Sequence, residues 1–381
     1  MRIVFLSHYA LPHVGGIETV IDGLADELAR RGHEVVHVAS NAQKVDAADA
    51  PPSYRVVGVP ALNALERLDV PYPLFGPGLL RVLRRELREA DVVHAHGFLY
   101  LPSVLGLPLA KRAAGSPVRV LTEHVGHVAY ESKLLNRAES LAVSTIGRTC
   151  LRAAEAIVTL NTRVSAELAR LAPGRRIDFI GNGVDVSRFR PADKAERAAL
   201  RTELGWTDGV PRVLFVGRLV AKKGIHLALS VAEAGNGEFE LVVAGPGELP
   251  GPPRPNVQVL GPQSREQLEV LYRAADAFLL PSHGEGFPVT VQEAMASGLP
   301  VVMCRDPGYE PHLDGAANAV ELTDPDPSAL LGALRTFLGN ENAREAASRA
   351  AVEHARRAFS LARAADEHES LYARVHRERA G

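Results

Sequence analysis

Residues 2–40, RIVFLSHYALPHVGGIETVIDGLADELARRGHEVVHVAS, decide the fold class. Ile3 to Leu6 is an uninterrupted apolar run, which is typical of a strand buried on both faces of a parallel sheet. Apolar residues then recur at helical spacing from Ile17 to Leu28, and Gly32 stands where a helix commonly ends. Glu34 to Ala39 reads as the next strand. Because parallel strands need a crossover helix between them, the stretch predicts a β-α-β unit and an α/β fold.

The same alternation continues along the chain and starts afresh at Pro211. In the first half we expect strands ending near His96, His124, Leu160 and Ile180. In the second half we expect strands at 212–216, 240–244, 257–260, 277–280 and 301–304, with helices at 225–233, 265–274 and 289–297. The pattern predicts two doubly wound, Rossmann-like domains facing each other across a cleft. They are residues 1–182, completed by a C-terminal helix at 359–381, and residues 183–358, with the charged segment 191–211 as a connector.

Composition excludes several classes of protein. A chain of 381 residues is long enough for two domains, and 46% hydrophobic with 23% charged residues is ordinary for a globular protein. The net charge of −2 gives no general attraction for nucleic acid. Cys150 and Cys304 are the only cysteines, which excludes a disulfide framework and a cysteine zinc site. The chain shows no signal peptide and no apolar run of about 18 residues, so we expect a soluble cytoplasmic protein.

Polar residues cluster where the predicted strands of the second half end, which is the edge where parallel sheets bind ligands. Gly286, Phe287, Pro288 and Val289 lead from a glycine loop into a helix, whose free N–H groups suit a phosphate. The carboxylates Glu285 and Glu293 flank that turn. After the strand at 212–216 come Arg218 and Lys223, two cations that can stabilise a departing nucleoside diphosphate. The plainer alternatives are a solvated basic turn and a glutamate that favours a helix start.

The spacing Glu285-x7-Glu293, within EGFPVTVQEAMASGLPV, resembles the signature of the bacterial-type retaining glycosyltransferases of family 4, which have the GT-B fold. Further similarities follow in order along nearly the whole chain. They are the glycine loop Gly15-Gly16-Ile17-Glu18, the domain entry Asn182-Gly183-Val184-Asp185, the basic segment Gly217–Gly224 and the closing helix from Phe359.

The resemblance implies transfer of a sugar from a UDP- or GDP-sugar to a hydroxyl acceptor, with retention of configuration and without a metal ion. It implies that Glu285 approaches the sugar hydroxyls, that Glu293 binds the ribose and that His124 faces the donor sugar. Arg218 and Lys223 then bind the diphosphate, and the first domain, through Gly15 and Gly16, receives the acceptor. Enzymes of this kind lack an obvious nucleophile, which implies front-face attack assisted by the leaving phosphate.

Other polar residues are weaker candidates. His8, His13, His96 and His127 are further histidines of the first domain. Pro288 departs from the family pattern and removes one N–H from the expected phosphate loop. Asp324-Pro325-Asp326 formally matches an Asp-x-Asp metal motif but reads as a turn. Lys222, beside Lys223, is expected to face solvent.

Residues 79–90 predict a helix with leucines on one face and four arginines on the other. Such a helix either packs its leucines on the sheet, which we favour, or contacts an anionic membrane, which would place the protein peripherally at the inner face of the membrane.

Three readings of the function remain open beside transfer: a nucleotide-sugar epimerase, a sugar phosphorylase and a catalytically silent nucleotide-sugar-binding subunit. Glu285 and Glu293 together with Arg218 and Lys223 favour transfer over all three. The sequence does not specify the sugar, the base or the acceptor, which could be a small molecule, a glycan or a lipid-linked hydroxyl.

Overall fold

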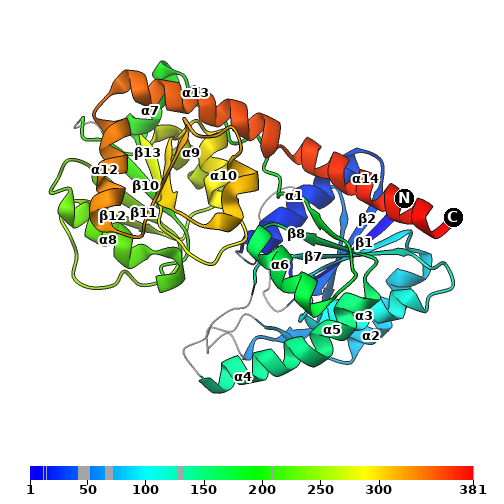
Figure 1. The fold of residues 1–381 in the computed structure, drawn as a ribbon. Helices are drawn as coiled ribbons and strands as arrows, with labels where there is room; N and C mark the ends of the chain where they lie inside the picture. The colour runs from blue at the N-terminus through cyan, green and yellow to red at the C-terminus, as the bar shows by residue number, and fades with distance from the viewer. Residues whose placement is uncertain are drawn as a thin grey trace. The chain divides into compact units, whose positions relative to one another are not determined.

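The computed structural model describes residues 1–11, 13, 15–41, 52–64, 72–126, 133–206 and 209–380. The chain forms two compact units (Figure 1). Unit 1 comprises Met1–Gly183 and Leu361–Gly381, and unit 2 is the continuous span Val184–Ser360.

Unit 1 is built on a parallel sheet of seven strands. In spatial order they are β3 (Arg55–Val59), β2 (Glu34–Ser40), β1 (Arg2–Tyr9), β6 (Val92–His96), β7 (Val118–Glu123), β8 (Ala156–Thr159) and β9 (Ile177–Phe179). The short strands β4 (Ala61–Leu62) and β5 (Leu74–Phe75) form a separate antiparallel pair.

Helices cover both faces of this sheet, as the alternation of side chains along β1 shows. Ile3 and Phe5 belong to one apolar cluster, and Val4 and Leu6 belong to the other. The first cluster lies under α1 (Gly16–Arg30) and α14 (Leu361–Ala380), which run along the same face (Figure 1). The second lies under α2 (Gly78–Glu86), η2 (Leu87–Glu89), α3 (Leu101–Lys111), α5 (Arg148–Ala153) and α6 (Thr162–Leu171). The segments α4 (Lys133–Ala142) and η3 (Val143–Gly147) precede α5.

Unit 2 repeats the plan with six parallel strands around one apolar core. Their spatial order is β12 (Val257–Gly261), β11 (Glu240–Ala244), β10 (Arg212–Val216), β13 (Ala277–Leu280), β14 (Val301–Cys304) and β15 (Val320–Thr323). The helical segments are α7 (Lys194–Glu203), η4 (Ala221–Lys223), α8 (Ile225–Ala234), α9 (Arg265–Ala274), α10 (Val289–Ala296), η5 (Pro307–Tyr309), α11 (Glu310–Leu313), α12 (Pro327–Leu338) and α13 (Glu341–Ala358).

The predicted class of two doubly wound α/β domains is confirmed. The reading of residues 191–211 as a connector is wrong, because α7 belongs to unit 2. Arg197 and Arg201 on α7 reach the buried Asp276, with the Arg197 NH2 nitrogen 2.7 Å from Asp276 Oδ1. Charged residues at helical spacing look like an exposed linker, but here they anchor the helix to the sheet through one buried carboxylate.

The chain enters and leaves unit 2 at one place. Val184 and Ser360 form a parallel β-bridge, and the Val184 N–H donates to the Phe359 carbonyl oxygen at 2.7 Å. On the unit 1 side of this crossing, a Cβ on Gly183 would lie 2.9 Å from Leu361 Cα, so the close approach requires glycine. The returning segment then continues as α14 and closes the core of unit 1.

The predicted helix at 79–90 is α2 followed by η2. Its leucines Leu79, Leu83 and Leu87 are buried in the core of unit 1, as the preferred reading expected. The apolar face is therefore unavailable to a membrane, while the arginines lie exposed. Across the part of the chain that the structure describes, no helix is both long and apolar enough to cross a bilayer.

Candidate active site

In the sheet of unit 2 the order in which strands are added reverses between β10 and β13. These two strands are neighbours in space although β11 and β12 separate them in sequence. Ligands of open parallel sheets bind at the carboxyl edge at such a switch point. Arg218 follows β10, and the loop from Pro281 to Pro288 follows β13. The switch point therefore places the predicted donor-binding residues of both segments at one edge.

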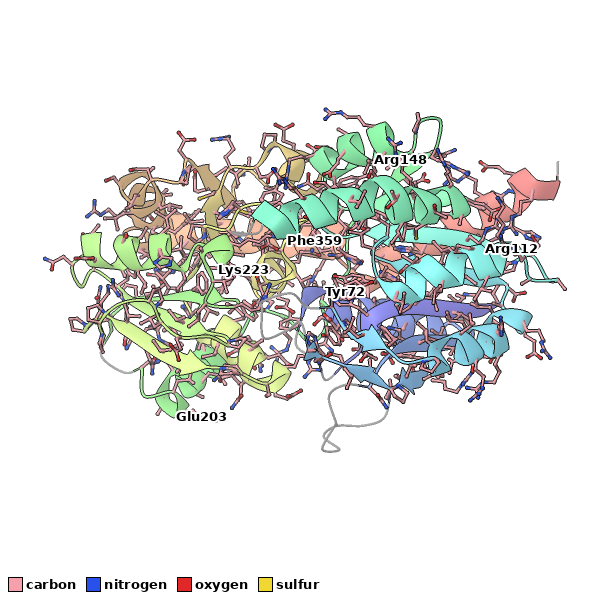
Figure 2. All side chains as sticks on the ribbon, turned by 90° about the horizontal axis from the view of Figure 1, so that it is seen from below. Tyr72, Arg112, Arg148, Glu203, Lys223 and Phe359 are labelled. Carbon is pink, nitrogen blue, oxygen red and sulfur yellow. The ribbon has the colours of Figure 1, made fainter. Side chains whose placement is uncertain are left out.

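Gly224 allows the two loops to touch. Its φ of +75° is in the left-handed region, and a Cβ there would lie only 2.1 Å from the Pro281 carbonyl oxygen. The His283 N–H also donates to the Lys222 carbonyl oxygen at 3.1 Å. As a result Lys223 Nζ lies 3.0 Å from Glu285 Oε1 (Lys223 is labelled in Figure 2). The structure thus brings together two side chains that sequence reasoning had assigned to different parts of the donor.

The helices that begin at these loops leave their N-termini uncapped. In unit 2 neither α8, which begins after Gly224, nor α10, which begins after Pro288, has a side-chain N-cap. The other helices of eight or more residues in the described part of unit 2 have polar caps, supplied by Asp193, Ser264, Asp326 and Asn340. An uncapped N-terminus carries free N–H groups and a partial positive charge, which suit an anion.

Pro288 occupies the N-cap position of α10. The missing N–H of Pro288 therefore lies before the first turn of α10. The N–H groups of Val289 and Thr290 are present, and at these positions a helix offers them no carbonyl partner. Pro288 thus removes an N–H only at the N-cap position and leaves the N–H groups of the first turn in place.

Arg218 is exposed and forms no ion pair with any described residue. Its segment is held in place by the Leu219 N–H, which donates to the Pro246 carbonyl oxygen at 2.9 Å. Lys222, expected to face solvent, is half-buried. The Phe287 ring is buried and stacks on His312 at a centroid distance of 4.3 Å, so it anchors the loop to the core.

Glu293 lies on α10 and is buried. The hydroxyl of Tyr272, itself fully buried on α9, donates to Glu293 Oε2 at 2.9 Å. Burial raises the pKa of Glu293 to about 7, against the opposing effect of the Tyr272 hydrogen bond. Tyr272 could not be predicted from the sequence. It lies on α9, 21 positions before Glu293 on α10, and no sequence pattern indicates that these two side chains are in contact.

Three further polar side chains near this edge escaped sequence reasoning. Ser282 Oγ, Thr290 Oγ1 and the Gln292 amide are buried atoms without a hydrogen-bond partner among the described residues. Buried polar groups usually have partners, so such a group of unsatisfied atoms is typical of a site that receives a polar ligand. The one feature of the sequence that could have indicated these residues is their position close to Glu285 and Glu293 along the chain.

In unit 1, the predicted glycine loop packs against a carboxylate. A Cβ on Gly15 would lie 2.2 Å from Glu18 Oε2, so a larger residue there would have to displace this carboxylate. Glu18 is buried in the first turn of α1, and its Oε1 lies 3.1 Å from His13 Nδ1 and 3.6 Å from His8 Nε2. Burial would raise the pKa of Glu18, but the hydrogen bond from His13 and the nearby His8 leave it lowered. Gly16 begins α1 and has open space where a Cβ would stand.

His124 follows β7 and is buried, with His124 Nε2 hydrogen-bonded to His96 Nδ1 at 2.8 Å. Burial lowers the pKa of His124 to about 3 and lowers that of His96 well below its usual range, so both imidazoles are neutral near pH 7. His127 lies outside the described residues.

The Asp-x-Asp match is a helix start. Asp326 Oδ2 accepts from the Ala329 N–H at 2.8 Å and caps α12. Within the described ranges, no three or more His, Cys, Asp or Glu side chains gather as a metal site would require.

Comparison with known proteins identifies the family and the fold. A family model described as glycosyltransferase family 4 matches residues 14–188, and one described as glycosyl transferases group 1 matches residues 196–354. The chain is 30% identical to a D-inositol 3-phosphate glycosyltransferase of Nocardia farcinica, over 96% of this chain and 87% of that protein. It is also 30% identical to a protein of the same name from Xylanimonas cellulosilytica, over 99% and 98% of the two chains.

Two solved structures share the fold. Sucrose-phosphate synthase from Thermosynechococcus elongatus superposes with a TM-score of 0.81 at 21% identity, covering 99% of both chains. The Anabaena protein HepE in complex with UDP superposes with a TM-score of 0.73 at 18% identity, covering 98% of this chain and 100% of that one.

Proposed function

Since the chain belongs to glycosyltransferase family 4, we propose that it is a retaining enzyme that moves a sugar from a UDP- or GDP-sugar to a hydroxyl acceptor without a metal ion. The observation that carries the proposal is the switch point of unit 2. There Lys223 lies beside Glu285, and the uncapped N-termini of α8 and α10 begin at the same two loops. This arrangement offers fixed positive charge to a diphosphate and a carboxylate to a sugar.

In the proposed reaction, the bond between the anomeric carbon and the diphosphate oxygen breaks. A bond from the acceptor oxygen forms on the same face of the sugar, and the acceptor proton passes to a phosphate oxygen of the leaving group. Arg218, Lys223 and the N–H groups at the start of α10 stabilise the charge that accumulates on the diphosphate. The role of Glu285 is to orient the sugar, and that of Glu293 is to bind the ribose hydroxyls.

Unit 1 is proposed to receive the acceptor through Gly15 and Gly16, and its neutral His124 is proposed to face the donor sugar. The two relatives named above suggest D-inositol 3-phosphate as one acceptor to test, beside glycans and lipid-linked hydroxyls.

Thermal denaturation with UDP, GDP, ADP and their sugar conjugates, all in EDTA, tests donor binding. A ligand at 100 times its Kd stabilises the folded state by about 2.7 kcal/mol, so a true donor raises the melting temperature by several degrees. The selected donor is then incubated with and without acceptors. Transfer, or slow donor hydrolysis without acceptor, supports the proposal. A melting shift without either reaction would indicate a silent binding subunit, and a change of the sugar without release of nucleotide would indicate an epimerase.

Peripheral membrane contact through residues 79–90 is a second and separate proposal. Because the leucines of that segment are buried, any such contact rests on the exposed Arg81, Arg84 and Arg88. Cosedimentation with anionic vesicles tests it, and binding should weaken when these arginines are replaced by glutamine.

A further inference from the structure

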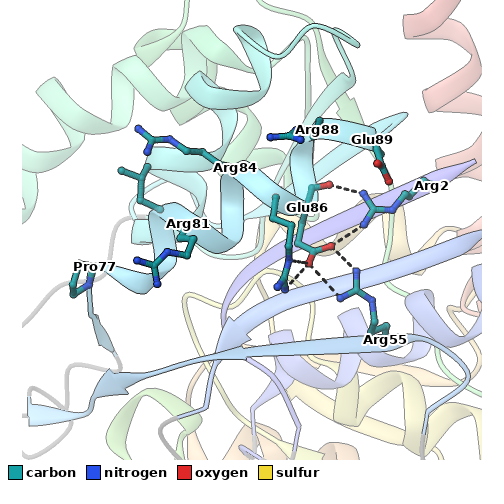
Figure 3. Close-up of a pocket in the computed structure, with 10 residues that line it drawn as sticks. Arg2, Arg55, Pro77, Arg81, Arg84, Glu86, Arg88 and Glu89 are labelled. Carbon is teal, nitrogen blue, oxygen red and sulfur yellow. Dashed lines mark hydrogen bonds and ion pairs between the residues drawn. The ribbon is translucent and has the colours of Figure 1, made fainter.

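A cavity of about 670 Å³ opens on unit 1 and is lined by arginines from four elements (Figure 3). Arg2 comes from β1, Arg55 from β3, and the others from α2 and η2. The complete set of arginines is Arg2, Arg55, Arg81, Arg84, Arg85 and Arg88. We call this cavity the arginine pocket.

The arginine pocket lies at one edge of the unit 1 sheet, and the predicted residues Gly15, Gly16 and His124 lie at the other edge of the same sheet. Arg2 and Arg55 are the first residues of β1 and β3, which run parallel to each other through β2. They therefore mark the amino edge of the sheet. Gly15, Gly16 and His124 follow the carboxyl ends of β1 and β7. No residue assigned to sugar transfer lines the pocket.

One buried carboxylate holds three of the arginines in place. Glu86, whose side chain is 2% exposed, accepts from Arg2 NH2 at 2.7 Å and from Arg85 Nε at 2.8 Å. Arg55 donates to the same carboxylate through NH2 and NH1 (Figure 3). Each guanidinium has five N–H donors, so these bonds leave further donors on every one of the three. Glu86 thus holds three guanidinium groups in place and leaves some of their N–H donors available for a ligand.

The remaining arginines have no acidic partner among the described residues. Arg81, Arg84 and Arg88 are exposed on one face of the helix, at spacings of three and four residues. Glu86 and Glu89 line the pocket, and Glu34 forms an ion pair with Arg2 Nε at 2.8 Å, so the six arginines exceed these three acidic residues by three positive charges. Like charges at this density repel one another, and an anion in the pocket would relieve that repulsion.

We propose that the arginine pocket binds a phosphate group, carried either by a phosphorylated metabolite or by a lipid headgroup. Guanidinium groups match phosphate oxygens in pairs, and the excess of three positive charges over the nearby carboxylates favours an anionic ligand. The volume admits a group larger than phosphate alone, such as a phosphorylated polyol. This site is separate from sugar transfer. If the ligand is a lipid headgroup, the proposal rests on the membrane contact proposed above and names phosphate as the group that is recognised.

The test compares two triple variants of the full-length protein. The first is Arg81→Gln, Arg84→Gln and Arg88→Gln. The control is Arg112→Gln, Arg148→Gln and Arg170→Gln, which removes the same charge from exposed arginines elsewhere on unit 1 (Arg112 and Arg148 are labelled in Figure 2). All six residues are exposed, so both variants should melt within a few degrees of the parent. Sugar transfer should be unchanged in both, and that assay reports on the proposed function independently.

Two probes separate the sources of phosphate. The first is inorganic phosphate, titrated against chloride at constant ionic strength with saturating nucleotide present, and followed by the NMR signals of the arginine Nε–H groups. The second is cosedimentation with vesicles of phosphatidylcholine alone or with 30% phosphatidylglycerol. Each arginine near an anionic surface contributes about fivefold, so the first variant should bind vesicles about 100-fold more weakly.

Phosphate binding that the first variant loses and the control retains supports the site with a free phosphate ligand. The same pattern with phosphatidylglycerol vesicles alone supports a lipid headgroup. Binding of neither probe at low salt, or an equal loss in both variants, overturns the proposal.

Discussion

Lys223 Nζ and Glu285 Oε1 lie 3.0 Å apart, and both side chains are partly exposed. In a half-buried ion pair of this kind the cost of desolvation offsets much of the Coulomb attraction, so the pair is weak evidence for a role in stability. Its position at the switch point of the unit 2 sheet, beside two uncapped helix N-termini, points instead to a role in binding charge. The same residues could hold a diphosphate once the donor displaces the internal pair.

Replacing Lys223 by alanine should therefore affect rate much more than stability. Loss of one preorganised donor to a developing charge costs about 3–4 kcal/mol, so Lys223→Ala should lower kcat/KM by about 10²–10³. Arg218→Ala should do at least as much, because a guanidinium can hold two phosphate oxygens. Lys194→Ala, which removes a lysine with a 91% exposed side chain in the same unit, is the charge-matched control and should stay within threefold of the parent. Equal activity of Lys223→Ala and Lys194→Ala would contradict the assignment.

Glu293 should make donor binding depend on pH. Its pKa is raised to about 7 by burial, so the carboxylate ionises as the pH rises from 6 to 8. The ionised form accepts stronger hydrogen bonds from the ribose hydroxyls, and we expect about fivefold tighter donor binding over that range. Calorimetry should use a nucleotide sugar, because a terminal phosphate itself titrates near pH 6. Glu293→Gln should bind more weakly than the parent at pH 8 and lose the pH dependence. A flat profile for the parent would refute the ribose contact.

Particular residues also show how far the sequence could predict the site. Glu285, Lys223 and Arg218 could be proposed from the sequence because each follows a strand in a glycine-rich segment. Tyr272, Ser282 and Gln292 were missed, since burial and pairing with α10 depend on packing that the sequence pattern does not encode. Glu86 was missed because it lies inside a run that reads simply as a basic helix.

At the scale of elements, the strands buried on both faces were the most predictable. Strands such as β1, β10 and β13 are continuous apolar runs, and they stand where the sequence predicts them. β3 was not predicted, because an edge strand with exposed residues, such as Arg55 and Val56, lacks that run. The connector reading failed at α7 because its anchor, Asp276, comes from the loop before β13.

The attachment of α14 to unit 1 depends on a cluster of buried histidines. His94 Nδ1 is hydrogen-bonded to the Tyr372 hydroxyl of α14 at 2.8 Å, and the His368 ring of the same helix lies 5.3 Å from that of His94. Burial lowers the pKa of His368 to about 4 and lowers that of His94 well below its usual range. In the folded unit these histidines therefore stay neutral at pH values at which the same histidines of the unfolded chain are protonated.

Unit 1 should consequently lose stability in acid. Because the folded-state pKa values lie below the unfolded value of about 6.5, the stabilisation is complete above pH 6.5 and falls as the pH drops from 6.5 toward 4. Each histidine contributes a slope of up to about 1.4 kcal/mol per pH unit. Hydrogen exchange, corrected for intrinsic rates, should show α14 losing protection at pH 5.5 relative to pH 7.5. Helix α12 of unit 2, which contains no histidine, serves as the internal reference, and an equal change in both helices would contradict the role of the cluster.

At the scale of the molecule, two doubly wound units share one plan but carry different chemistry. Unit 2 is a single continuous span, whose carboxyl edge holds cations, glutamates and free helix N-termini. Unit 1 is closed by the returning α14 and has a histidine-rich carboxyl edge and an arginine-rich amino edge. This division fits an enzyme in which one unit binds the nucleotide sugar and the other serves the acceptor and an anion.

The most direct test of retaining, metal-independent transfer is proton NMR of the product formed in EDTA from a donor of known anomeric configuration. The coupling constant of the anomeric proton reports whether the product keeps that configuration. We predict that transfer proceeds at full rate in EDTA and that the new linkage has the configuration of the donor. A product of opposite configuration, or activity that EDTA abolishes and magnesium or manganese restores, would contradict the mechanism.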